Sequence, residues 1–180
     1  MTPTVYSPFQ KFLHWTIFAL IVGLWCVAHL RGFLPKDSPG RGLIIGIHIS
    51  FGLLLFALVP LRVVWRFLRG APELPAGTPP LEAILAKVAH LALYALMIVI
   101  PVLGLCLVWL HGHGASFFGL FTIPSPIAES KSLHDTVSGV HELLANIILV
   151  LLALHVVAAF WHHFAKKDNV LTRMLPKRAS

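Results

Sequence analysis

Residues 140–161 have the sequence VHELLANIILVLLALHVVAAFW, and this run decides the class of fold. It is long enough to cross the hydrocarbon core of a bilayer as a helix, because a span needs about 20 mostly apolar residues. The run contains two histidines, His141 and His155, and one acidic residue, Glu142. Ionisable side chains are costly inside a membrane, so the histidines indicate a functional site.

Three further stretches have the same length and apolar character. They cover Phe9–Leu30, Leu43–Trp65 and Leu85–Leu110. The first stretch lacks the small-residue cleavage site of a signal peptide, so we expect it to stay as a helix. A membrane-spanning backbone must satisfy its own hydrogen bonds, which helices do. The sequence therefore predicts an all-α fold, a transmembrane four-helix bundle, as a single membrane domain over residues 1–180.

The composition excludes other classes of protein. The chain has 180 residues, of which 57% are hydrophobic and 12% are charged. Soluble domains carry about 25% charged residues, so an ordinary soluble or disordered chain is excluded. Cys26 and Cys106 both lie in apolar runs, where we expect them to pack as apolar residues rather than form a disulfide framework.

Basic residues are distributed unevenly between the two sides of the predicted bundle. One side holds ten of them: Lys11, Arg62, Arg66, Arg69, Lys87, Lys166, Lys167, Arg173, Lys177 and Arg178. The other side holds four: Arg31, Lys36, Arg41 and Lys131. The positive-inside rule then predicts that both termini are cytoplasmic. The net charge of +7 is mainly this topology signal, so we expect a lipid bilayer as partner and no nucleic acid.

The connection between the third and fourth spans, residues 112–135, is the longest. It contains the apolar sequence FFGLFTIP at residues 117–124. Such a segment is expected to lie on the membrane surface rather than extend into water.

Histidines are the unusual feature of this chain, which has eleven of them. Six lie within the predicted spans or at their edges: His14, His29, His48, His90, His141 and His155. His141 and His155 are 14 residues apart, close to four helical turns, so they lie on nearly one face and are separated by about 21 Å. This distance is too long for one metal centre and suits two cofactors at two depths.

Depth suggests a partner for each of these two histidines. His14 lies near the cytoplasmic end of the first span, at the level of His155. His48 lies near the outer end of the second span, at the level of His141. Two opposed imidazoles without an acidic or thiolate partner are typical of bis-histidine haem ligation. Gly52, one turn from His48, would let a porphyrin approach the backbone or two helices pack closely.

Several alternatives remain open at this point. His90 is a second candidate for the inner level, His29 for the outer level, and His162 and His134 lie seven residues from His155 and His141. The alternatives to haem ligation for this group of histidines are packing within the bundle, a proton relay and metal-ion transport. A zinc site is less well supported, because a closed site needs four converging ligands.

The chain resembles the bacterial cytochrome b561 family over nearly its full length. The residues that carry the resemblance are His14-Trp15, Arg31-Gly32-Phe33 with Pro35, Ile47-His48, His90 with Tyr94, Pro101-Val102-Leu103-Gly104, His141-Glu142, Leu144-Ala145-Asn146, His155, His162-His163, Lys167-Asp168-Asn169 and Arg173-Met174. The resemblance implies four helices that hold two b-type haems. It favours the pairs His14/His155 and His48/His141, and leaves His29, His90 and His163 without an assigned role.

Similar family members are regarded as superoxide oxidases that reduce ubiquinone. The resemblance therefore implies an oxidoreductase of the bacterial inner membrane, with superoxide or another electron donor at the outer face. The alternatives are a haem-bearing anchor subunit that relays electrons for a larger dehydrogenase, and a histidine-based ion transporter.

Two sets of residues are candidates for substrate contacts. The outer cations that would steer superoxide are Arg31, Lys36, Arg41 and Lys131. Lipid headgroups, or salt bridges to Asp37 and Glu129, are the alternative partners of these cations. The candidates for a quinone site are Lys11, Trp15 and His162, and anchoring at the membrane interface is the alternative for Lys11 and Trp15.

Overall fold

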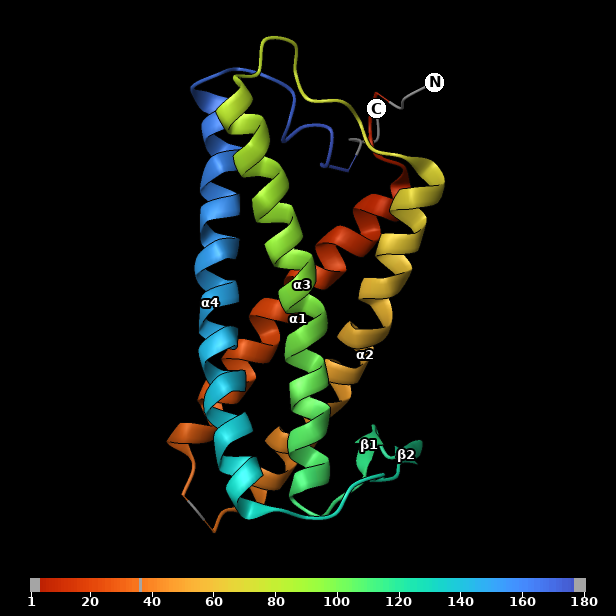
Figure 1. The fold of residues 1–180 in the computed structure, drawn as a ribbon, viewed down its shortest axis with the longest axis vertical. Helices are drawn as coiled ribbons and strands as arrows, with labels where there is room; N and C mark the ends of the chain where they lie inside the picture. The colour runs from red at the N-terminus through yellow and green to blue at the C-terminus, as the bar shows by residue number, and fades with distance from the viewer. Residues whose placement is uncertain (1–3, 36, 177–180) are drawn as a thin grey trace.

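The computed structural model describes residues 4–35 and 37–176 of the chain. Its main elements are four long helices, shown in Figure 1: α1 (Pro8–Leu30), α2 (Pro39–Arg69), α3 (Pro80–Leu110) and α4 (Lys131–Phe164). All four are long and apolar enough to cross a membrane. The predicted all-α transmembrane four-helix bundle is confirmed, while the cytoplasmic position of the termini stays a prediction.

Helices α1 and α2 begin before the predicted apolar spans, where a serine cap and a proline start each of them. At α1, the Ser7 hydroxyl accepts a hydrogen bond from the Gln10 backbone N–H, and the Gln10 side chain accepts one from the Ser7 N–H. Pro8 then supplies a helical φ at the first position. At α2, the Ser38 hydroxyl accepts a hydrogen bond from the Gly40 N–H, and Pro39 begins the helix.

The start of α1 and the end of α4 lie at the same end of the bundle, at the top of Figure 1. We call this the inner end and the opposite end the outer end, following the predicted orientation. Helix α1 packs mainly on α2, and α3 packs mainly on α4, while α2 and α3 join the two helix pairs.

The buried core lies in the middle of the bundle. Its residues are Ile17, Ile21, Leu55, Val59, Leu93, Met97 and Ile148. Ile148 is halfway along α4 between His141 and His155, so an apolar layer separates the levels of these two histidines. Close apolar packing at this height excludes water from the space between the two levels.

The third connection differs from the expectation in one respect, because it contains a β-hairpin. Strands β1 (Ala115–Phe117) and β2 (Phe121–Ile123) pair antiparallel, with Ala115 opposite Ile123. The hairpin is attached to α2 by the Ser50 hydroxyl, which accepts a hydrogen bond from the Phe118 N–H at 2.9 Å. Its position at the membrane surface stays a prediction.

The same connection is also shorter than expected. Helix α4 begins at Lys131, so His134 and Asp135 are helical rather than part of a loop.

Candidate functional site

The four predicted ligand histidines form two close pairs in the structure. The rings of His14 on α1 and His155 on α4 have their centres 6.2 Å apart. The rings of His48 on α2 and His141 on α4 have theirs 6.3 Å apart. Each pair therefore connects α4 to a helix of the α1–α2 pair, at the inner level and the outer level respectively.

The spacing within each pair fits a shared iron atom. A metal–imidazole bond of about 2 Å on each side, with the ring centre roughly 1.1 Å behind the nitrogen, separates two opposed ring centres by about 6.2 Å. Both observed separations match this value. The residues present thus fit a haem with two histidine ligands at each level.

Hydrogen bonds orient both rings of the outer pair. His48 Nδ1 lies 3.2 Å from the Leu24 carbonyl oxygen, and His141 Nδ1 lies 3.1 Å from that of Ile100. A carbonyl oxygen only accepts, so each Nδ1 is the donor and each Nε2 keeps its lone pair free for a metal. Histidine ligands of metals commonly donate their second nitrogen in this way.

Gly104 makes room for the ring of His141. A Cβ atom at position 104 would lie 3.2 Å from Cε1 of His141, a contact that few side chains tolerate. Gly104 is one turn after Ile100, so both residues belong to the face of α3 on which the His141 ring rests. Gly52 was predicted to give room to a porphyrin or a neighbouring helix. Nothing lies within 4 Å of a Cβ built there, so its role stays a prediction.

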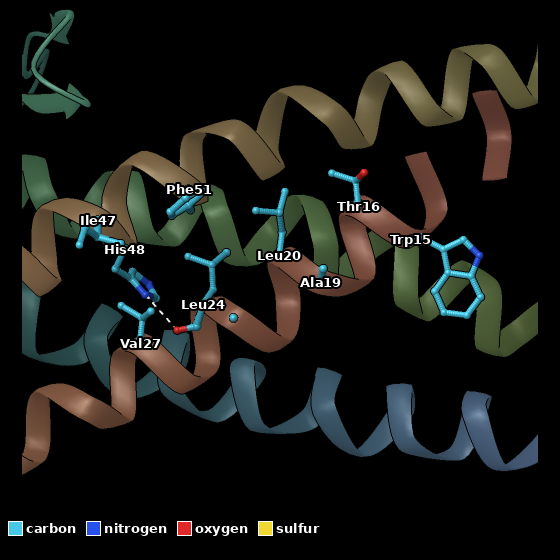
Figure 2. Close-up of a pocket in the computed structure, with 10 residues that line it drawn as sticks. Trp15, Thr16, Ala19, Leu20, Leu24, Val27, Ile47, His48 and Phe51 are labelled. Atoms are coloured by element: carbon cyan, nitrogen blue, oxygen red, sulfur yellow. Dashed lines mark hydrogen bonds between the residues drawn. The ribbon is translucent and has the colours of Figure 1, made fainter. Parts of the chain in front are cut away.

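An apolar cleft of about 490 Å³ lies beside the outer pair, between α1 and α2. Figure 2 shows that it extends from Trp15 to His48, past Leu20 and Leu24. Its volume is in the range of small-molecule and cofactor sites. Gly23 also lines it, with open space where a Cβ would be. The cleft thus offers apolar space for a ligand next to His48.

The inner level contains a third imidazole. The ring centre of His90 on α3 is 5.5 Å from that of His155, shorter than the spacing expected across an iron. His14 is therefore the better-spaced partner of His155, and His90 lies beside the pair.

The remaining candidate histidines lie outside both pairs. His29 Nδ1 donates to the Trp25 carbonyl, and the His29 ring lies 3.8 Å from the Trp25 ring. His134 contacts His111 and Asp135 at the outer end. Within residues 4–35 and 37–176, no group of three or more His, Cys, Asp or Glu side chains is arranged to hold a metal ion.

The three candidate quinone residues are all bonded to the C-terminal segment, residues 165–176. The Lys11 ammonium donates to the Leu175 carbonyl at 2.7 Å, and the Trp15 indole N–H donates to the Met174 carbonyl at 3.1 Å. The Trp15 ring is also 5.3 Å from that of His14. This segment therefore connects the start of α1 to the end of α4 beside the inner pair.

His162, the third of these residues, anchors the base of the C-terminal segment. Its Nδ1 donates to the Asp168 carboxylate at 2.5 Å. Burial raises the pKa of Asp168, but the bonds from His162 and the Val170 N–H, with the charge of Lys166, outweigh it and lower that pKa below its ordinary 3.8.

The outer cations differ in their distance from the outer pair. Arg31 lies within electrostatic range of His48. Arg41 donates to the Leu34 carbonyl, and Lys131 is exposed at the start of α4. The ion pairs of the described part of the chain include none of these three, and Lys36 lies outside the described residues.

The chain is similar to proteins of one family over nearly its whole length. The family model for prokaryotic cytochrome b561 matches residues 5–177. Similar proteins are the probable superoxide oxidase CybB of Yersinia pestis, 33% identical over 96% of this chain and 97% of that one, and cytochrome b561 homolog 1 of Escherichia coli K12, 31% identical over 96% and 98%. Cytochrome b561 homolog 2 of the same strain is 32% identical over 99% and 95%. The chain therefore belongs to the prokaryotic cytochrome b561 family and is a multi-pass bacterial membrane protein that binds haem b and transfers electrons.

Proposed function

We propose that this protein oxidises superoxide at the outer face of the bacterial inner membrane and reduces ubiquinone. In this proposal two haem b groups are held by His48/His141 at the outer level and His14/His155 at the inner level. The observation that carries the proposal is the presence of two imidazole pairs, both at the spacing of iron ligands, at two depths of one bundle.

The residues around the pairs suit electron transfer across a membrane. A haem held by two histidines at each level would supply electron transfer rather than oxygen binding. The helix rise places His141 and His155 about 21 Å apart along α4. The apolar layer around Ile148 keeps water out of the space between them.

Charge at the outer end supports an anionic electron donor. Arg31 is the outer cation within electrostatic range of His48, and positive charge near a site raises the local concentration of anions. The name of the Yersinia pestis relative, probable superoxide oxidase, agrees with superoxide as that anion. Two superoxide anions each give up one electron and leave as O₂.

Contacts at the inner end support reduction of a membrane-dissolved acceptor. Trp15 contacts the ring of His14 and lines the apolar cleft. Its side chain is 37% exposed and that of Lys11 only 8%, so Trp15 is the more accessible of the two to a ligand. Ubiquinone bound beside Trp15 would lie next to the inner pair with its chain in apolar surroundings. There the two electrons, with two protons from the cytoplasmic side, convert ubiquinone to ubiquinol.

The first experiment is a haem count on the purified chain by the pyridine haemochromogen spectrum. We expect two haems b per chain. A haem-free protein would favour the ion transporter, and a single haem would contradict the two-site proposal.

The second experiment uses liposomes that contain the protein and ubiquinone, with superoxide generated outside. We expect ubiquinol to form, and external superoxide dismutase to abolish its formation. His141→Ala, which removes one ligand of the outer pair, is the matched control and should form no ubiquinol. A two-haem preparation that forms none would favour the haem-bearing anchor subunit.

A further inference from the structure

Two arginines on α2 lie beside the inner histidines. Arg62 and Arg66 are one helical turn apart and therefore share a face of α2. Arg62 is within electrostatic range of His14, His155 and His90, and Arg66 is within range of His90. Positive charge is thus concentrated at the inner level of the bundle.

A hydrogen bond attaches one of these arginines to α1, and a pocket lies beside both of them. Arg62 Nη1 donates to the Gln10 carbonyl at 3.1 Å, and Gln10 is one turn before His14. A small pocket here is lined by Tyr6, Gln10, Arg62, Arg66 and Tyr94. Tyr94 is one turn after His90 on α3. Both arginines therefore line a pocket together with two tyrosines, whose hydroxyl groups are further potential donors.

Neither arginine has an acidic partner in the described part of the chain. The ion pairs there are His134–Asp135, His162–Asp168 and Lys166–Glu82. Both arginines are half-buried. Charged groups at such positions are costly unless an opposite charge compensates them, so this pocket is suited to an anion. Arginine binds carboxylates through two parallel N–H···O bonds.

We infer that Arg62 and Arg66 bind the propionate carboxylates of the inner haem, with Tyr6 and Tyr94 as additional hydrogen-bond donors. This inference rests on the proposed function for the presence of a haem between His14 and His155. Haem b carries two propionates, which matches two cations without a carboxylate partner. Positive charge at this position also favours the reduced iron, which carries one charge less than the oxidised iron.

The first test is a redox titration of the holoprotein and of the double variant R62Q/R66Q. At a fixed potential, we expect the oxidised-to-reduced ratio of the inner haem to rise about tenfold in the variant, a decrease of about 59 mV in its midpoint potential. The outer haem should keep its potential. Arg69→Gln is the matched control, because Arg69 is on the same helix but stacks over Trp65 and does not line the pocket.

The second test separates propionate binding from a general effect of charge. His141→Ala protein, which is expected to keep only the inner haem, is freed of haem and titrated with haem b or with its dimethyl ester, in which both carboxylates are blocked. With both arginines present, we expect the ester to bind about tenfold more weakly than haem b. With R62Q/R66Q in the same background, we expect this tenfold difference to fall to the small remainder that Tyr6 and Tyr94 contribute.

Two results would overturn the inference. One is an ester penalty that is the same with and without the arginines, which would be the outcome if the pocket binds a lipid phosphate instead. The other is an unchanged midpoint potential of the inner haem in R62Q/R66Q. Where the double variant does not fold, Arg62→Lys and Arg66→Lys keep the charge but lose the two-bond geometry, and should show an intermediate ester penalty. Wild-type protein with two haems and no ubiquinol formation would contradict the proposed reaction and leave this inference standing.

Discussion

The ring of His141 on α4 rests on Gly104 of α3, at the point where the Ile100 carbonyl accepts its Nδ1–H bond. A side chain at position 104 would therefore displace the His141 ring from its present place against α3. Overpacking of this kind costs about 1–3 kcal/mol. We expect Gly104→Ala to lower the occupancy of the outer haem and Gly104→Val to abolish it, as measured by haem content and visible spectra.

The matched control for Gly104 is Gly139→Ala on α4, since nothing lies within 4 Å of a Cβ at position 139. This variant should keep both haems. Full outer occupancy in Gly104→Val would show that His141 is not held against α3 in the holoprotein.

The second prediction concerns the ligand pairs. We expect His155→Ala to lose the inner haem and keep the outer one, and His141→Ala to do the reverse, because each removes one of two opposed rings. His90→Ala should keep both haems, since its spacing from His155 is too short for a shared iron. The number of haems per chain in each purified variant tests these expectations.

A control for the ligand variants is His29→Ala, because His29 stacks on Trp25 outside both pairs. Loss of the inner haem in His90→Ala with retention in His14→Ala would instead assign His90 as the ligand opposite His155.

The third prediction concerns the bond between α1 and α4. The Trp25 indole N–H donates to the Asn146 side-chain oxygen at 3.1 Å. Side-chain hydrogen bonds between membrane helices contribute about 0.6 kcal/mol on average and up to about 1.7. We expect a coupling energy in this range from a double-mutant cycle of Trp25→Phe and Asn146→Leu, measured by reversible unfolding in detergent. A coupling energy of zero would mean that the bond adds no stability.

The fourth prediction concerns Arg31. Because Arg31 is the outer cation near His48, we expect Arg31→Gln to slow haem reduction by superoxide severalfold at low salt. High salt should slow the wild type toward the variant, since ionic screening weakens attraction at long range. Stopped-flow kinetics at several ionic strengths measures both effects. Arg69→Gln at the inner end is the control and should leave the rate unchanged; equal slowing by this control would exclude local steering.

The fifth prediction follows from the lowered pKa of Asp168. A carboxyl group with a lowered pKa in the folded state stabilises that state fully above its ordinary value of 3.8, and the contribution is lost as the pH falls through the lowered pKa. We expect the C-terminal segment to stay protected from hydrogen exchange down to about pH 3.8 and to open only at more acidic pH.

Asp168→Asn removes the charge that His162 binds, so it should reduce this protection already at neutral pH. The control is Asp135→Asn, whose side chain is 67% exposed and pairs with His134 at the opposite end of the bundle. Equal protection in Asp168→Asn and wild type would show that other bonds, such as that from Lys11 to Leu175, hold the segment alone.

Much of the site could be predicted from the spacing of residues along single helices. The 14-residue interval between His141 and His155 gives one helical face and two depths, and both are local properties of a helix. Their depths in the predicted spans indicated His14 and His48 as partners. In the structure the ring of His14 lies beside that of His155, and the ring of His48 beside that of His141. The hairpin at residues 115–123 was missed because its strands are only three residues long and its attachment depends on Ser50, far away in the chain.

Four membrane-spanning helices thus follow from apolar length alone, because a backbone inside a bilayer must satisfy its own hydrogen bonds. The packing of the helices, in contrast, determines which imidazoles approach to 6.2 and 6.3 Å, which carbonyls orient them, and that Gly104 supports the ring of His141. The physical reason is that rotation of one helix about its axis moves a side chain by several ångströms without any change in its depth. That rotation is set by packing between helices, which no spacing along a single helix records.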